Sequence, residues 1–137
     1  MAGGPAGREL SGIMEHALRQ AGILGARKVP AAGVYSIRTE EGAGMQWPAH
    51  TDYAHAAVQH LLHDRARVPL SALWAASAAF ELWDITGTRR VHVPAGMVAV
   101  FRADYWHCGG PHLSDSMRVH GFVVPEGVSI PSATYTK

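Results

Sequence analysis

The stretch that shows the fold most clearly runs Arg90-Val91-His92-Val93-Pro94-Ala95-Gly96-Met97-Val98-Ala99-Val100-Phe101-Arg102. It contains two runs of strand length, and a Pro-Ala-Gly turn signal at residues 94–96 separates them. Short apolar runs broken by turn residues continue on both sides of this stretch. The pattern predicts a mainly β protein rather than a chain of alternating strands and helices.

The remaining predicted strands have similar lengths. They are Val34–Arg38, Ala56–Leu62, Leu70–Ala76, Phe80–Ile85 and Met117–Val124. Residues 72–79 are rich in alanine, but their place between two strand runs favours strand and turn over helix. Many short strands with regular turn signals are typical of a double-sheet jelly roll or barrel.

One helix is predicted before the first strand, from Arg8 to Ala21, with Gly22 at its end. We expect this helix to pack on the outside of a sheet, because its apolar residues recur at helical spacing, namely Leu10, Ile13, Met14, Ala17 and Leu18. Residues 1–7 are expected to be disordered, and residues 8–137 to form a single domain.

The composition restricts the possible partners. Charged residues make up 17% of the 137 residues and the net charge is +1, which does not favour a nucleic-acid partner. No apolar run approaches the roughly 20 residues of a membrane span, so we expect no membrane partner. The single cysteine, Cys108, excludes an internal disulfide and is typical of the cytoplasm or another reducing intracellular compartment. Exposed sheet edges in so small a domain leave a homodimer open.

The chemistry is concentrated in His50-Thr51-Asp52 and in His107, which follows Asp52 by fifty-five residues. Residues i and i+2 of a strand point to the same side, so His50 and Asp52 are expected to reach one metal ion together. Two histidines and one carboxylate form the facial triad that holds Fe(II) and leaves other coordination positions open. We therefore predict that His50, Asp52 and His107 are metal ligands and catalytic residues.

An arginine strengthens this interpretation. Arg118 lies eleven positions after His107 and opens a strand-like run to Val124. An arginine directed into a barrel can bind a carboxylate through two parallel hydrogen bonds. The His-x-Asp pattern alone or Arg118 alone has a plain structural explanation. Together they predict an iron site beside a carboxylate co-substrate.

The motif residues resemble a known group of enzymes. The segments that carry the likeness are Met45–Tyr53, Pro69–Ala75 and Val93–Gly109, and the likeness extends over roughly Val34 to Val124. They are similar to the Fe(II)/2-oxoglutarate-dependent oxygenases, and among these to the phytanoyl-CoA-hydroxylase-like members. The gap of eleven residues between His107 and Arg118 fits that branch.

This resemblance implies a double-stranded β-helix, also called a jelly-roll or cupin-like barrel, with one N-terminal helix packed outside. It implies that His50, Asp52 and His107 bind Fe(II) and that Arg118 binds the distal carboxylate of 2-oxoglutarate. The implied activity is hydroxylation of a small-molecule substrate, with release of succinate and CO₂.

The roles of neighbouring residues are open at this point. Tyr35 either donates its hydroxyl to 2-oxoglutarate or is a core tyrosine. His120 faces inward with Arg118 by strand alternation, where many relatives have serine or threonine, and it either hydrogen-bonds the co-substrate or changes which co-substrate fits. Ser71 and Trp74 fall on opposite faces of one strand. Gln46 is expected near the pocket.

Three other functions remain as alternatives. Jelly rolls host many unrelated activities, so a cupin-like metal-binding or sugar-binding protein is one of them. A nucleobase oxygenase on the same fold is the second, although no basic stripe with interleaved aromatic residues supports it. The third is a catalytically idle relative, which the short chain suggests.

Overall fold

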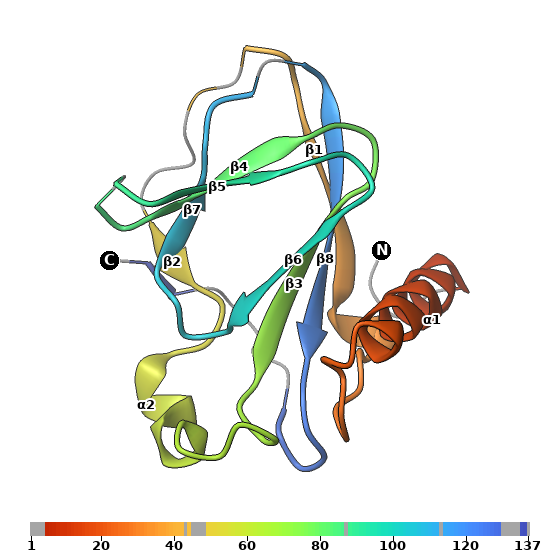
Figure 1. Cartoon of the computed structure of the whole chain (residues 1–137), viewed down its shortest axis with the longest axis vertical. Helices are drawn as coiled ribbons and strands as arrows, with labels where there is room; N and C mark the ends of the chain where they lie inside the picture. The colour runs from red at the N-terminus through yellow and green to blue at the C-terminus, as the bar shows by residue number, and fades with distance from the viewer. Residues whose placement is uncertain are drawn as a thin grey trace.

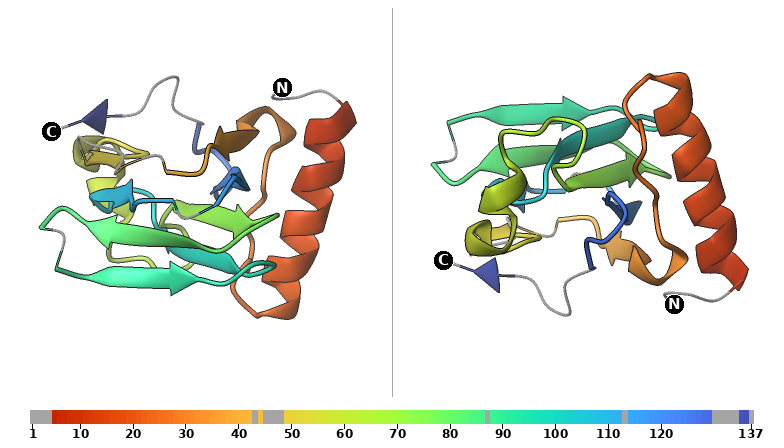
Figure 2. Two further views of the ribbon diagram at one scale, coloured as in Figure 1. Left: turned by 90° about the horizontal axis from the view of Figure 1, so that it is seen from above. Right: turned by 90° about the horizontal axis from the view of Figure 1, so that it is seen from below.

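The computed structural model describes residues 5–42, 44, 49–86, 88–112, 114–129 and 135–136. Two antiparallel sheets form the walls of a barrel, and one long helix lies outside it (Figures 1 and 2). Among these residues no helix is long and apolar enough to cross a membrane.

The strands divide into a sheet of four and a sheet of five. The first has the order β1 (Val34–Thr39), β8 (Ser116–Val123), β3 (Leu70–Ala75), β6 (Val98–Arg102). The second has the order β5 (Arg90–Val93), β4 (Phe80–Asp84), β7 (His107–Gly109), β2 (His50–Thr51), β9 (Tyr135–Thr136). Neighbouring strands are mostly not consecutive in sequence, so the chain crosses repeatedly from one sheet to the other, as in a jelly roll.

Most of the predicted strands are confirmed. Those at residues 34–38, 70–76, 80–85, 90–93, 97–102 and 117–124 correspond to β1, β3, β4, β5, β6 and β8, with ends that differ by one residue at most. The alanine-rich segment 72–79 is strand and bend, as expected.

The predicted strand Ala56–Leu62 is wrong. This segment forms helix α2 (His55–Val58) and the 3-10 turn η2 (Gln59–Leu61). Val58 and Leu61 are its buried residues, and a spacing of three residues is helical rather than strand-like. A short apolar run of this length is compatible with either a strand or a helix. The sequence alone does not show which of its residues become buried, so it does not distinguish the two.

Helix α1 (Pro5–Gln20) begins earlier than predicted. Residues 5–7, which we expected to be disordered, form its first turn. Proline is favoured at the first helical position, because its missing N–H would have no partner there. At the other end Gly22 adopts a φ of 72°, and the Ile23 N–H donates to the Leu18 carbonyl at 2.9 Å, which closes the helix.

The helix lies at the side of the barrel formed by β1 and β8 (Figure 1), and it contacts both strands. Met14 and Leu18 are buried and pack in one cluster with Val119 and Val123 of β8. Gly121 permits the close approach, since a Cβ at this position would collide with the Met14 sulfur and lie 3.2 Å from Val29 Cγ1. The outward residues of β8 thus hold the helix, and its inward residues face the barrel interior.

The close contact at Gly121 leads to a prediction about the free energy of unfolding. Gly121→Ala should lower the free energy of unfolding by about 1–3 kcal/mol, because the added methyl group overpacks the interface between helix and strand. The measurement is urea denaturation followed by circular dichroism.

Gly12→Ala is the matched control. Gly12 is an exposed position in the middle of α1, and apart from its chain neighbours and the helix backbone no atom of the described residues lies within 4 Å of its added Cβ. This variant should stabilise the protein by about 0.5–1 kcal/mol, since alanine is the better helix former. Equal stability changes in the two variants would contradict the proposed overpacking.

Candidate metal centre

Three side chains of ligand type converge inside the barrel. The Nε2 atoms of His50 and His107 each lie 3.8 Å from Oδ1 of Asp52. One ligand atom from each residue can be chosen so that all lie within 4.8 Å of one another. The structure therefore brings together the three residues that the sequence predicted as ligands, with a donor set that suits a divalent transition metal.

Strand pairing places the two histidines. His50 of β2 is directly opposite His107 of β7, and their ring centroids are 4.5 Å apart. Nδ1 of His107 lies 2.8 Å from the Tyr105 carbonyl oxygen, so it carries the proton and Nε2 keeps its lone pair. Burial lowers the pKa of His107, and Asp52 opposes this shift only in part. A neutral imidazole with a fixed tautomer is the form that binds a metal.

Asp52 reaches the site differently from the sequence-based expectation. Strand β2 contains only His50 and Thr51, and Asp52 lies in the bend that follows. The N–H groups of Asp52 and Tyr53 both donate to the Ala103 carbonyl, at 3.0 and 2.9 Å. Backbone hydrogen bonds to a neighbouring loop, rather than alternation along a strand, therefore direct this carboxylate inward.

The second oxygen of Asp52 is also occupied. Its Oδ2 accepts a hydrogen bond from the Ser71 hydroxyl at 2.6 Å and lies 3.1 Å from His120 Nε2. Burial raises the pKa of Asp52, but favourable interactions, among them the hydrogen bonds from His120 and Ser71, outweigh it and lower the value to about 2. Asp52 is therefore ionised, although it is only 1% exposed.

Sequence reasoning missed the role of Ser71. It placed Ser71 and Trp74 on opposite faces of one strand, and the structure agrees, since Trp74 packs against the outer cluster under the helix. The available signal was a polar residue in a run that is otherwise apolar, namely Leu70-Ser71-Ala72-Leu73. A polar residue in such a run indicates a buried hydroxyl, but it does not indicate which residue the hydroxyl hydrogen-bonds.

Arg118 faces the same small cavity as the three ligand-type residues. The cavity has a volume of about 30 Å³, and Arg118 is 1% exposed. Its Nε has no hydrogen-bond partner, and its Nη2 donates only a long bond, 3.4 Å, to Thr39. The Phe80 ring lies 5.3 Å from the guanidinium carbon. Among the described residues, no carboxylate forms an ion pair with this buried cation.

Tyr35 and His120 line the cavity as a stacked pair. Their ring centroids are 4.7 Å apart and their planes differ by 23°. Burial raises the pKa of Tyr35 to about 12, so its hydroxyl remains a donor. His120 faces inward with Arg118, and in this structure it contacts Asp52. Gln46 lies outside the described residues.

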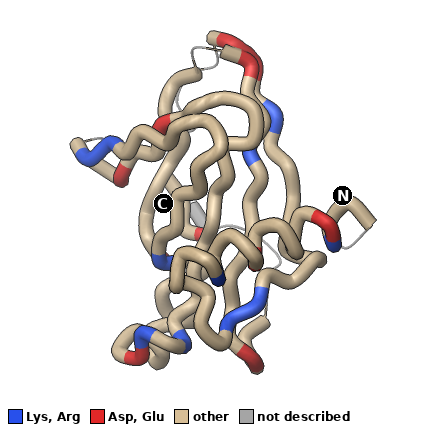
Figure 3. Tube along the Cα trace, turned by 45° about the vertical axis from the view of Figure 1, so that its right-hand side comes forward, with Lys and Arg blue, Asp and Glu red and all other residues tan. Residues whose placement is uncertain are grey.

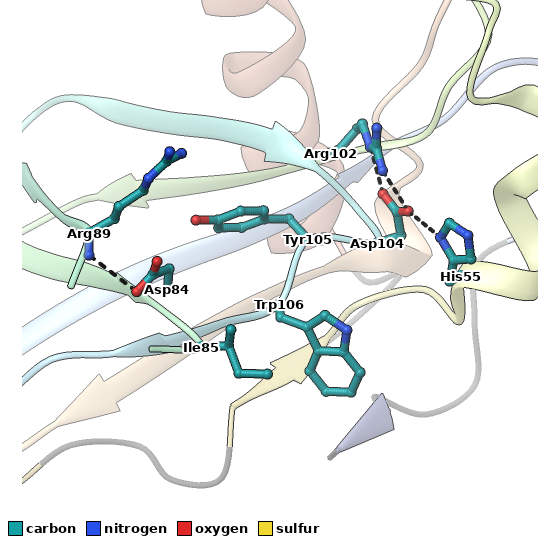
Figure 4. Close-up of a pocket in the computed structure, with 8 residues that line it drawn as sticks. All are labelled: His55, Asp84, Ile85, Arg89, Arg102, Asp104, Tyr105 and Trp106. Carbon is teal, nitrogen blue, oxygen red and sulfur yellow. Dashed lines mark hydrogen bonds and ion pairs between the residues drawn. The ribbon is translucent and has the colours of Figure 1, made fainter. Parts of the chain in front are cut away.

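A second carboxylate fixes the loop between β6 and β7. Asp104 has a side chain only 1% exposed, and it accepts hydrogen bonds from Arg102 at 2.8 and 2.9 Å and lies 2.9 Å from His55 Nδ1 (Figure 4). Burial raises the pKa of Asp104, but these partners lower it overall from 3.8. The resulting stabilisation is complete above pH 3.8 and is lost as the pH falls through the lowered pKa.

The same loop borders an open cleft of about 400 Å³, shown in Figure 4. Tyr105 and Trp106 of the loop form one wall, and Asp84, Ile85 and Arg89 form the other. Asp84 is paired with His107 across β4 and β7. The cleft therefore lies beside the strand that carries a ligand-type histidine.

Comparisons with known proteins support the fold of this chain but no specific activity. No family model and no curated protein matches the sequence. A prolyl-4-hydroxylase from Pseudomonas putida has a TM-score of 0.54 at 16% identity, over 92% of this chain and 71% of that one. An RmlC-like cupin protein from Desulfovibrio desulfuricans has a TM-score of 0.48 at 14% identity, over 67% of this chain and 71% of that one.

The chain has a double-stranded β-helix fold. The two antiparallel sheets, their strand order, the outer helix and the likeness to the hydroxylase structure agree on this point. The predicted fold class is thereby confirmed. At 16% identity the likeness carries no activity to this chain, and the finer resemblance to phytanoyl-CoA-hydroxylase-like enzymes stays a prediction.

The network around Asp104 predicts a link between loop and metal site. Asp104→Asn should lower the free energy of unfolding by about 1–3 kcal/mol, since it removes the charge that Arg102 and His55 satisfy. It should also weaken metal binding, because the adjacent residues 103 and 105 hold Asp52 and His107. Denaturation and metal titration measure the two effects.

Asp115→Asn serves as the control, because Asp115 is exposed and accepts a single bond from the Glu41 N–H. Its stability should stay within about 0.5 kcal/mol of the wild type. If Asp104→Asn behaved like this control, the loop would not depend on the carboxylate.

Proposed function

We propose that this protein is an Fe(II)- and 2-oxoglutarate-dependent oxygenase that hydroxylates a small molecule. His50, Asp52 and His107 are the proposed metal ligands, and Arg118 is the proposed site for the distal carboxylate of the co-substrate. The double-stranded β-helix supports this proposal, because the fold accommodates such centres. The possible metal site inside the barrel supports it at the level of individual residues.

The observation that carries the proposal is the buried Arg118, which forms no ion pair with any carboxylate of the described residues. A guanidinium remains charged at all relevant pH values, and burying a charge without a partner is costly. An anionic ligand in the cavity would supply the missing partner through charge-assisted hydrogen bonds. Because Arg118 faces the cavity that the three ligand-type residues line, the anion it binds would lie beside the metal.

The residues of the chain have distinct tasks in this proposal. When bound, Fe(II) and 2-oxoglutarate supply the activation of O₂ and the oxidation of a substrate C–H bond. His107 presents an unprotonated Nε2, and Asp52 supplies one negative charge. Arg118 orients the co-substrate by pairing with its carboxylate, and the Tyr35 hydroxyl stays protonated as a donor toward it. The open cleft beside β7 is the proposed place for the substrate.

A cupin-like metal-binding protein is the second candidate, and the size of the cavity favours it. About 30 Å³ is the space of roughly one water molecule. A five-carbon oxo acid enters only if the lining side chains move apart, whereas a metal ion alone needs no such change. Binding of 2-oxoglutarate therefore separates the two candidates.

A nucleobase oxygenase receives less support. Lysines and arginines of the described trace are interspersed with acidic residues and do not form a continuous stripe in Figure 3. The net charge of +1 agrees with this distribution. A phosphate backbone is normally bound by clustered basic residues, so a small-molecule substrate is the better proposal.

An anaerobic titration tests the proposed function. Metal-free protein receives Fe(II) and then 2-oxoglutarate, and a visible charge-transfer band should appear when the oxo acid chelates the iron. Arg118→Gln should weaken 2-oxoglutarate binding by roughly 10- to 100-fold, because a charge-assisted hydrogen bond contributes about 1.5–3 kcal/mol. Iron binding should change little.

Arg38→Gln is the matched control, since Arg38 is paired with Met117 next to Arg118 but is exposed. Its titration should match that of the wild type. Iron binding without the band would reject 2-oxoglutarate and support the cupin-like candidate. Failure to bind iron would reject both.

A further inference from the structure

We propose that Ser71 and His120 together hold Oδ2 of Asp52 by hydrogen bonds, so that only Oδ1 of this carboxylate is available to bind the metal. This inference rests on the proposed metal site and adds two positioning residues to it. Both residues come from the four-stranded sheet, on the neighbouring strands β3 and β8. The metal ligands themselves come from β2, the bend after it, and β7.

The two oxygens of Asp52 have separate environments. Oδ1 lies at the same distance, 3.8 Å, from Nε2 of His50 and of His107. Oδ2 lies 2.6 Å from the Ser71 hydroxyl and 3.1 Å from His120 Nε2. One oxygen thus faces the two histidines, and the other faces two donors at hydrogen-bonding distance.

The His120 ring must donate through Nε2. A carboxylate oxygen only accepts hydrogen bonds, so an unprotonated Nε2 at 3.1 Å would place two lone pairs against each other. The opposite ring nitrogen, Nδ1, is buried and has no partner among the described residues, which suits an unprotonated atom better than an N–H. The tautomer of His120 is therefore the reverse of that in His107, whose Nδ1 carries the proton.

Packing fixes the plane of the His120 ring. Tyr35 stacks on it at 4.7 Å, and Phe122 meets it at 4.7 Å with an interplanar angle of 74°. His120 is 2% exposed and Ser71 is fully buried. Neither donor can turn toward solvent, so Asp52 cannot rotate without leaving both of them unpaired.

The consequence concerns the coordination positions that remain open. A carboxylate with two available oxygens can chelate a metal and take up one extra position. With Oδ2 engaged, Asp52 occupies a single position, and the position it would otherwise take stays open for other ligands. His120 is a positioning residue, because its Nε2–H donates a hydrogen bond to Asp52 and its Nε2 therefore does not bind the metal.

Two variants test the proposal through metal binding rather than activity. Ser71→Ala and His120→Gln should each weaken Co(II) binding to the metal-free protein by about 10- to 100-fold, as loss of a partner behind a metal ligand does elsewhere. The visible absorption of the Co(II) protein should also change, because release of Oδ2 alters the coordination number. The controls are Ser36→Ala and His92→Gln, at exposed positions on β1 and β5.

A measurement on the wild type needs no variant. Histidine-selective ¹H–¹⁵N NMR of the metal-free and Zn(II)-loaded protein should show His120 protonated at Nε2 in both states. His50 and His107 should show the shift of a metal-bound nitrogen after zinc is added. A metal-bound nitrogen signal from His120 would make it a fourth ligand and overturn the proposal.

The outcomes separate this inference from the proposed function. Absence of metal binding by the wild type would reject the metal site and, with it, the positioning roles. Normal binding by the wild type with unchanged affinity and spectrum in folded Ser71→Ala and His120→Gln would reject only the positioning roles. If either variant fails to fold, the NMR result decides.

Discussion

The interaction on which the structure depends most is the burial of one ionised carboxylate at the centre of the barrel. Asp52 is 1% exposed, and four side chains surround it, from β2, β3, β7 and β8. These strands belong to both sheets, so the charge can be satisfied only when the two walls are correctly placed. Polar contacts at this point therefore specify the closure of a barrel whose other inward contacts are largely apolar.

The short loop between β6 and β7 connects the two parts of the site, the His107 side and the Asp52 side. Three of its four residues act on different partners. The Ala103 carbonyl accepts from the backbone of the aspartate bend, the Asp104 carboxylate binds Arg102 and His55, and the Tyr105 carbonyl fixes the His107 tautomer. The loop is a turn that the Tyr105 N–H closes by donating to the Arg102 carbonyl at 3.0 Å. It links the strand that supplies one histidine to the bend that supplies the carboxylate.

Sequence patterns predict the strands well where turn residues bound an apolar run, as at Leu70–Ala75 and Arg90–Val93. They fail at α2, because a short apolar run has no unique period. The cluster of His50, Asp52 and His107 is predictable from residue type and spacing, but the route by which Asp52 reaches it is not, since that depends on backbone hydrogen bonds to Ala103. Contacts such as Ser71 with Asp52 join distant strands, and one sequence does not reveal them.

Strand β8 has a consequence for how this protein can evolve. Its outward residues, including Gly121, are committed to the helix, and its inward residues Arg118 and His120 are committed to the interior. A strand used on both faces has little mutational freedom. The hairpin between β4 and β5 is more exposed and borders the open cleft. Substitutions should therefore be tolerated more readily in that hairpin than on β8.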